Sequence, residues 1–332
     1  MRFRMSSRSI TSHAEVGALQ PDKLTLARAY YSRGIAYDKK GEYDRAIADF
    51  TKAIQLKPDD ANIYYNRGIA YYAKGNFISA IEDLNKAIQL KPNYAIAHNS
   101  RGMAYYAKGN FARAIEDFTK VIELNPNYAY AYNNRGGAYR SEGNYARAIE
   151  DCTRAIKLNP NYAEPYSNRG AAYREKGLID RAIADYDKAI QLKPDLVEAH
   201  YNRGRAYGEK GDYDRAIVDY TTAIEIKPKL VEAYNNRGNA YTKTGEYARA
   251  IEDYNRAIQR KPDLAESYAS RGEAWLHLSE WERAKFDLTT ARDMGVNIIT
   301  SFHNDYASVP DFERIIGIKL PADIAAMLTP QQ

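Results

Sequence analysis

One dipeptide recurs at a fixed interval along the chain, and this periodicity constrains the fold more than any other feature. Arg-Gly returns every 34 residues, at Arg33, Arg67, Arg101, Arg135, Arg169, Arg203, Arg237 and Arg271. A row of alanines from Ala46 to Ala284 has the same period. Such a period is typical of an array in which each short module packs only against its neighbours. We therefore expect the 332 residues to form stacked modules and not one large globular core.

Each module has the pattern of two helices joined by a tight turn, and the second module shows this most clearly. Its first helix should run from Ala61 to Gly75, because glycine best accommodates a left-handed C-terminal cap. Asn76 can cap the next helix, which should stop before Pro92. A pair this short cannot bury its apolar face alone, so the pairs must stack on one another. The sequence predicts an all-α solenoid of eight tandem helix-turn-helix repeats.

These residues resemble the tetratricopeptide repeat family, from Ala27 to about Ile298. In the second repeat the family pattern falls on Tyr64, Gly68, Tyr71, Ala80, Leu84, Ala87 and Pro92. The resemblance implies a right-handed superhelix whose first helices line a concave peptide-binding groove. Arg67 is a departure, because the family usually has leucine there.

The ends of the chain lose the repeat pattern. In the eighth repeat Ser279 replaces the turn glycine, and Met294-Gly295-Val296 replaces the Lys-Pro ending. Residues 299–332 have apolar residues at helical spacing and are predicted to form a C-terminal helical cap; a separate docking motif is the alternative. We expect residues 1–21 to be a flexible basic tail and residues 22–298 to form the eight-repeat solenoid.

The recurring arginine has a recurring acidic counterpart. Arg67 lies eight residues before Gly75 and Asp83 eight residues after it, so in an antiparallel pair the two side chains lie at the same height. We predict cross-helix ion pairs, Arg67 with Asp83 and Arg101 with Asp117, that fix the register of the two helices. The alternative is a pair within one helix, such as Arg45 with Asp49.

Composition argues against several classes of function. The net charge of +5 is small, and no run approaches the length of a membrane span. Cys152 is the only cysteine, and the five histidines lack the spacing of a metal site or of a nucleophile with its base. We therefore expect neither an enzyme nor a cofactor or metal site. The N-terminus lacks the apolar stretch of a secretory signal, so the prediction is a cytoplasmic protein.

If the groove binds a peptide, its candidate residues lie on the first helices. The position before each arginine often holds asparagine, at Asn66, Asn134, Asn168, Asn202 and Asn236. Each amide offers a donor and an acceptor to a peptide backbone, although local hydrogen bonding is an equally good interpretation. The other candidates are Arg140, Arg174, Tyr72 and Tyr106.

The leading functional hypothesis is a scaffold that binds an extended or helical segment of another protein. Single-stranded nucleic-acid binding is the less favoured alternative, because Glu164 to Glu266 interrupt any basic strip in the groove. Homo-oligomers formed through the ends of the repeat array are a further alternative.

Overall fold

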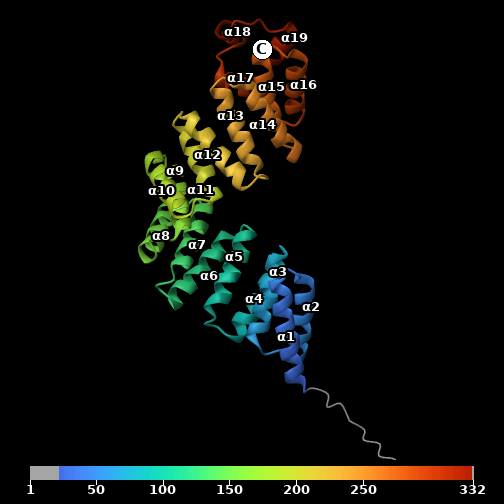
Figure 1. The fold of residues 1–332 in the computed structure, drawn as a ribbon, viewed down its shortest axis with the longest axis vertical. Helices are drawn as coiled ribbons and strands as arrows, with labels where there is room; N and C mark the ends of the chain where they lie inside the picture. Colours follow the sequence, from blue (N-terminus) through green and yellow to red (C-terminus); the bar gives the residue numbers. More distant parts are fainter. Residues whose placement is uncertain (1–21, 331–332) are drawn as a thin grey trace, which may run out of the picture. The chain divides into compact units, whose positions relative to one another are not determined.

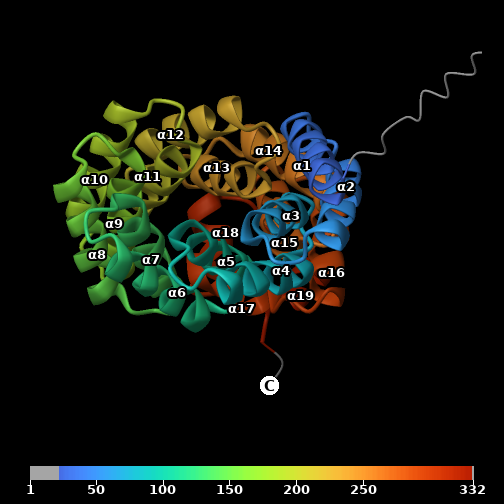
Figure 2. The same ribbon diagram turned by 90° about the horizontal axis from the view of Figure 1, so that it is seen from below.

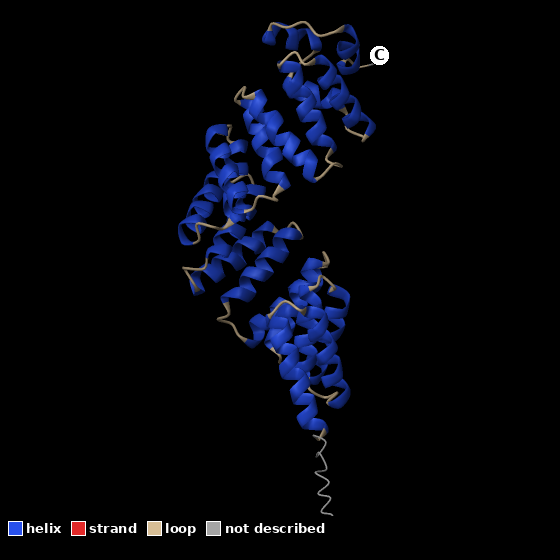
Figure 3. Cartoon of the chain, turned by 45° about the vertical axis from the view of Figure 1, so that its right-hand side comes forward, coloured by secondary structure: helices blue, strands red, loops and turns tan. Residues whose placement is uncertain are grey.

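A computed structural model describes residues 22–330, and within this range the secondary structure consists of nineteen α-helices without strands (Figures 1 and 3). The predicted tail, residues 1–21, lies outside the described residues. The chain divides into two compact units, Met1–Leu124 and Asn125–Gln332, each of which is described separately below.

The described part of unit 1 consists of three helix pairs, and in each pair the two helices pack against each other. The helices are α1 (Lys23–Lys39), α2 (Tyr43–Leu56), α3 (Ala61–Ala73), α4 (Phe77–Leu90), α5 (Ala95–Ala107) and α6 (Phe111–Leu124). Odd-numbered helices are the first helices of their repeats, and even-numbered helices are the second.

Unit 2 continues the same arrangement with five further pairs and three short helices. The pairs are α7 (Ala129–Ser141) with α8 (Tyr145–Leu158), α9 (Ala163–Glu175) with α10 (Ile179–Leu192), α11 (Val197–Glu209) with α12 (Tyr213–Ile226), α13 (Val231–Lys243) with α14 (Tyr247–Arg260), and α15 (Ala265–His277) with α16 (Trp281–Asp293). The short helices are α17 (Ile298–Asp305), α18 (Val309–Ile316) and α19 (Ala322–Leu328). The fold is thus an α-solenoid of eight helix pairs within the described range.

The turn inside each repeat follows from its glycine. Gly75 has φ +78°, and its amide donates to the Tyr72 carbonyl at 2.9 Å. The next amide, that of Asn76, donates to the Tyr71 carbonyl at 2.9 Å, so the last carbonyls of α3 are satisfied. The Asn76 side chain then accepts from the Ser79 amide and caps α4. In the eighth repeat Ser279 adopts φ +59°, the one non-glycine residue between 22 and 330 with positive φ.

A second glycine in each repeat lets the paired helices approach closely. A Cβ built on Gly204 of α11 would lie 2.9 Å from the Tyr220 ring of α12, nearer than real Cβ contacts come. The alanines recurring at Ala182, Ala216 and Ala250 are fully buried at the same interface. Small residues therefore set the distance between the two helices, and aromatic rings or aliphatic side chains fill the space beside them.

The first helices form the inner layer of unit 2. Consecutive first helices from α7 to α15 contact one another, whereas consecutive second helices contact one another little or not at all. A stack of helix pairs with closer spacing on one side must curve toward that side. Figure 2 shows α7, α9, α11 and α13 on the inner side of this curve, with α8, α10 and α12 outside. Side chains of the odd-numbered helices therefore line the inner face.

The C-terminal helices cover the last repeat. Helix α17 packs on both α15 and α16, and α19 packs on α17. They share a core with the eighth repeat that includes Leu276, Phe302, Phe312, Ile324 and Leu328. Two side-chain hydrogen bonds tie α15 to α17 and to Tyr306, the residue after it: Ser301 Oγ to Glu273 Oε1 at 2.9 Å, and Tyr306 Oη with His277 Nε2 at 2.8 Å. The C-terminal face of the array is thus closed by the chain itself.

Candidate functional site

The recurring arginine contacts the aspartate of the facing helix. Arg67 donates from Nε to Asp83 Oδ2 at 2.7 Å and from Nη2 to Asp83 Oδ1 at 2.7 Å. The same bidentate bond joins Arg33–Asp49, Arg101–Asp117, Arg135–Asp151, Arg169–Asp185, Arg203–Asp219, Arg237–Asp253 and Arg271–Asp287. Arg45, the same-helix alternative for Asp49, instead donates to Glu42 at 2.6 Å.

The third guanidinium nitrogen reaches the preceding repeat. Arg67 Nη1 donates to Thr51 Oγ1 of α2 at 2.9 Å, and Arg101 Nη1 donates to Asn85 Oδ1 of α4 at 2.6 Å. Equivalent bonds run from Arg169, Arg203, Arg237 and Arg271. The accepting residue always lies two positions after the aspartate of the earlier repeat. These acceptors form a row of threonine, asparagine and aspartate that was not predicted from the sequence. Each of these arginines therefore joins three helices from two repeats.

Burial makes the pairs structural rather than available to a ligand. The Arg67 side chain is 17% exposed and that of Asp83 only 8%. The Asp83 carboxylate raises the pKa of Arg67, so this guanidinium stays charged. Arg33 is 55% exposed, because no second helix precedes it within residues 22–330.

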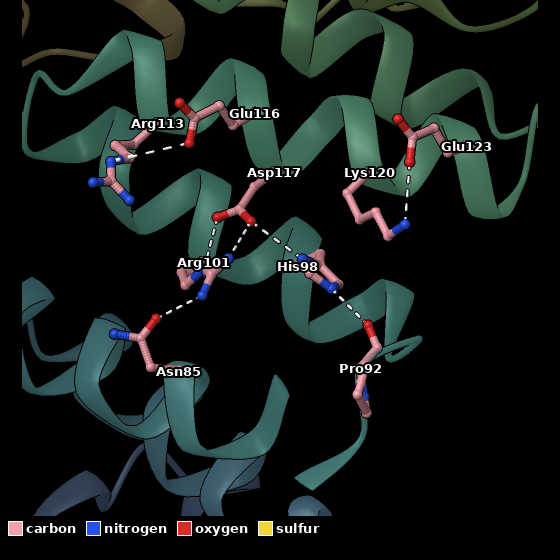
Figure 4. Close-up of polar contacts among 9 residues, drawn as sticks. All are labelled: Asn85, Pro92, His98, Arg101, Arg113, Glu116, Asp117, Lys120 and Glu123. Carbon is pink, nitrogen blue, oxygen red and sulfur yellow. Dashed lines mark hydrogen bonds and ion pairs between the residues drawn. The ribbon is translucent and has the colours of Figure 1, made fainter. Parts of the chain in front are cut away.

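Two histidines also lie in this structural layer. Figure 4 shows His98 between Asp117 and the Pro92 carbonyl, with Nδ1 3.2 Å from Asp117 Oδ1 and Nε2 2.9 Å from the carbonyl oxygen. His200 has the same two contacts, with Asp219 and the Pro194 carbonyl. Both rings are buried, so they belong to the packing between repeats.

The asparagine row forms bonds between adjacent first helices. Asn168 Nδ2 donates to Asn133 Oδ1 at 2.9 Å, and Asn236 Nδ2 donates to Tyr201 Oη at 3.1 Å. In unit 1, Asn66 Nδ2 donates likewise to Tyr31 Oη at 2.9 Å. These bonds occupy the amide nitrogens, but the amide oxygens of the same three residues have no hydrogen bond within the described chain.

Asn202 lacks the bond to the preceding repeat that Asn66, Asn168 and Asn236 make. Asn202 has no side-chain hydrogen bond within residues 22–330, because the residue 35 positions earlier is Ser167, whose short side chain does not reach it. Asn134 Oδ1 accepts a long bond of 3.5 Å from Asn133 Nδ2. The row therefore links repeats through its nitrogens and presents acceptors on the inner face of unit 2.

The remaining predicted residues fall into three environments. Arg174 is buried and ion-paired, to Glu209 Oε1 at 2.5 Å and to Glu175. Arg140 is half-buried and has no ion pair within residues 22–330, and its Nε is a buried donor without an acceptor. In unit 1 the rings of Tyr72 and Tyr106 pack at 5.4 Å against Phe77 and Phe111 respectively.

A pocket of about 290 Å³ opens on the inner face of unit 2 beside α11 and α13. Its lining includes Arg205, Gly208, Tyr220, Asn236, Asn239 and Lys243, of which Asn236 alone was a predicted site residue. The sequence signal for this pocket is Gly208, which stands where four earlier repeats have Tyr72, Tyr106, Arg140 and Arg174.

The described residues offer little that resembles a reaction centre. Burial raises the pKa of the Cys152 thiol to about 12, so this cysteine is neutral and unreactive at ordinary pH. Across residues 22–330 no group of three or more His, Cys, Asp or Glu side chains is placed to hold a metal ion. In the same range no helix combines the length and apolar character that crossing a membrane requires.

Comparison with protein families matches repeat descriptions along most of the chain. The description "TPR repeat" matches residues 34–75, 70–109, 171–211 and 204–245. The description "Tetratricopeptide repeat" matches residues 99–163, 152–184 and 231–264. Together these matches run without a gap from residue 34 to residue 264. Comparison with curated protein sequences gives no match.

Several solved structures resemble this chain. The tetratricopeptide repeat protein from Parabacteroides merdae ATCC 43184 is 21% identical with a TM-score of 0.54, covering 81% of this chain and 98% of its own. The Cut9–Hcn1 structure of the APC/C is 20% identical with a TM-score of 0.62, covering 77% of this chain and 50% of its own. A MamA protein is 30% identical with a TM-score of 0.47, covering 51% and 92%. The first two share the helical-repeat fold.

Proposed function

Because the chain belongs to the tetratricopeptide repeat family, we propose that it is a non-enzymatic scaffold that binds an extended segment of another protein. The proposed surface is the inner face of unit 2, made by α7, α9, α11 and α13. Its contact residues are those of the asparagine row, Asn134, Asn168, Asn202 and Asn236, together with Arg140 and the lining of the pocket beside Gly208.

The acceptor row carries this proposal. Asn168 and Asn236 are each held by a bond from Nδ2 to the preceding repeat, which fixes the direction of the amide oxygen before any ligand arrives. An acceptor that is already oriented costs less ordering entropy on binding. A peptide backbone supplies the matching donors, its N–H groups.

The spacing of the row also suits a peptide. Packed helices lie about 8–10 Å apart, and an extended chain advances about 3.3 Å per residue. One asparagine per repeat would then meet about every third residue of an extended segment. The side chains between these contacts are left to reach the more variable positions of the surface, such as Gly208, and to supply specificity.

The charge pattern supports a protein partner over a nucleic acid. Glu164, Glu198, Glu232 and Glu266 recur at one position of the inner helices. Of these, Glu164 is ion-paired, to Lys193 at 3.0 Å. A row of carboxylates along the surface would repel a phosphate backbone.

The test is selection of binders from a random 12-residue peptide display library. We expect extended peptides to be enriched on the wild type and their affinity to fall about 5- to 10-fold in Asn202→Ala. Asn202 makes no internal side-chain bond within the described chain, so this variant should keep the thermal stability of the wild type. Gln259→Ala, which removes an exposed amide from α14, is the matched control and should bind normally. Equal binding by all three proteins would contradict the proposed surface.

A further inference from the structure

The pocket beside α11 and α13 exists because one position of the inner face lacks a side chain there. Gly208 is a helical glycine, and a Cβ built on it would meet only Tyr220 Oη, at 4.0 Å. In the four repeats directly before it this position holds tyrosine or arginine, whose side chains would fill such a space. The volume of about 290 Å³ lies at the lower limit of small-molecule sites, about 300–1,000 Å³. It therefore suits one inserted side chain better than a separate ligand.

The ionised side chains that line the pocket leave one charge without a partner. Glu209 is paired with Arg174 at 2.5 Å, and Lys243 is paired with Asp305 of α17. Arg205 has neither an ion pair nor a hydrogen bond within residues 22–330, although it is half-buried. Its guanidinium therefore provides donors for an anion that the described chain does not supply.

The two asparagines of the pocket present complementary groups. Asn239 Oδ1 accepts from Tyr254 Oη at 2.8 Å, which leaves the Nδ2 of Asn239 as a donor. Asn236 donates from Nδ2 to Tyr201, which leaves its Oδ1 as an acceptor. A ligand thus meets donors from Arg205 and Asn239 and one acceptor from Asn236.

We propose that this pocket binds one aspartate or glutamate side chain of the partner segment. The carboxylate would accept from Arg205 and Asn239, and the backbone N–H of the same residue would donate to Asn236. The inference rests on the proposed function and adds the residue class that the inner face selects. One carboxylate matches the local charge, since Lys243 and Glu209 are already ion-paired and Arg205 is the lining cation without an ion pair within residues 22–330.

The test compares peptide selection on three proteins. The random 12-residue library is applied to the wild type, to Arg205→Gln and to Arg181→Gln, a control that removes an exposed arginine from α10. Wild type and control should enrich an acidic residue at one fixed position, and Arg205→Gln should not. Circular dichroism melts that coincide for the three proteins show that Arg205→Gln is folded.

A double-mutant cycle then measures the contact itself. Changing the acidic residue of a selected peptide to its amide should weaken binding to the wild type about 10- to 100-fold, and binding to Arg205→Gln less than about twofold.

Three outcomes would overturn the proposal. Peptides that need Asn202 but carry no fixed acid would leave the binding surface intact and refute only the carboxylate pocket. If a phosphoserine binds more tightly than glutamate at the same position, the pocket selects a phosphate dianion and not a carboxylate. Selection of no peptides at all would refute the binding surface and the pocket together.

Discussion

Arg67 Nη1 lies 2.9 Å from Thr51 Oγ1, and this bond crosses from one repeat to the one before it. The same guanidinium holds Asp83 through its other two nitrogens, so one side chain fixes both the register within a repeat and the contact between repeats. A leucine at this position would pack against its neighbours but would form no directional hydrogen bonds. The arginine thus contributes geometric specificity to an array in which every repeat is nearly the same.

Removing this arginine should lower the free energy of unfolding most where its side chain is buried. In Arg67→Ala the Asp83 carboxylate, 8% exposed, is left without its partner, and we expect a loss of about 3 kcal/mol in the free energy of unfolding. Arg33→Ala is the matched control, because Arg33 makes the same bond to Asp49 but is 55% exposed and has no preceding repeat within residues 22–330. Urea unfolding curves that shift equally for the two variants would refute the role in linking repeats.

The sequence was sufficient for the features that depend on local spacing. The 34-residue period predicts the helix pairs, and the equal distances of Arg67 and Asp83 from Gly75 place the two side chains at one height. The bond to Thr51 could not be predicted, because it depends on how far one repeat is displaced along the next. The same is true of Asn168, whose nitrogen bonds Asn133 across that contact.

The pocket shows a different limit of sequence reasoning. Gly208 marks a gap in a row of large residues, but a gap becomes a pocket only if no neighbouring side chain fills it. Here Arg174 forms an ion pair with Glu209, and Lys243 forms one with Asp305 of α17. These pairs leave the space open and leave Arg205 without an ion pair within residues 22–330. Asp305 is 62 residues from Lys243, so a periodic pattern cannot show this contact.

The turn of the eighth repeat should carry measurable strain. Ser279 has φ +59°, a region in which a side chain costs about 1 kcal/mol relative to glycine. Ser279→Gly should therefore raise the free energy of unfolding by about that amount. The reverse change, Gly245→Ser, should lower it similarly, because Gly245 has φ +80° and open space around its Cβ position. Chemical denaturation of both variants checks this, and two shifts of the same sign would contradict it.

The contact between α15 and α17 should give stability two opposing dependences on pH. Burial of the Glu273 carboxyl raises its pKa from 4.5 to about 7; the negative charge of Asp305 also raises it, and the hydrogen bond from Ser301 lowers it in part. The folded protein then binds this proton more tightly than the unfolded chain. Its contribution is therefore fully present below pH 4.5 and is lost as the pH rises to about 7, by about 3 kcal/mol in all.

His277 should act in the opposite direction. Burial lowers its pKa from 6.5 to about 4, so the unfolded chain binds the proton more tightly and stability rises between pH 4 and pH 6.5. The rise should be smaller than the loss at Glu273, because part of the ring is exposed to solvent. The two effects offset each other over most of this range in the wild type.

Single variants should separate the two effects. In Glu273→Gln the stability should rise from pH 4 to pH 6.5, as His277 alone dictates. In His277→Phe, which can keep the stacking on Tyr247, stability should fall from pH 4.5 to pH 7. Urea unfolding at intervals of half a pH unit measures both slopes, and slopes of equal sign in the two variants would refute this account.

Two glycines one turn apart on α11 should respond oppositely to the same substitution. A Cβ at Gly204 would lie 2.9 Å from the Tyr220 ring, so Gly204→Ala must push α11 and α12 apart and should cost about 1–3 kcal/mol. A Cβ at Gly208 would come no nearer than 4.0 Å to Tyr220 Oη, and alanine is favoured over glycine inside a helix by up to about 1 kcal/mol. Gly208→Ala should therefore stabilise the protein.

Because the added methyl group projects into the pocket, the Gly208→Ala variant should also lower the affinity for any peptide whose acidic side chain enters there. Thermal melts and peptide titrations of the two variants separate these effects. A Gly208→Ala protein that is more stable and binds the acidic peptide unchanged would show that the pocket is not where the side chain enters.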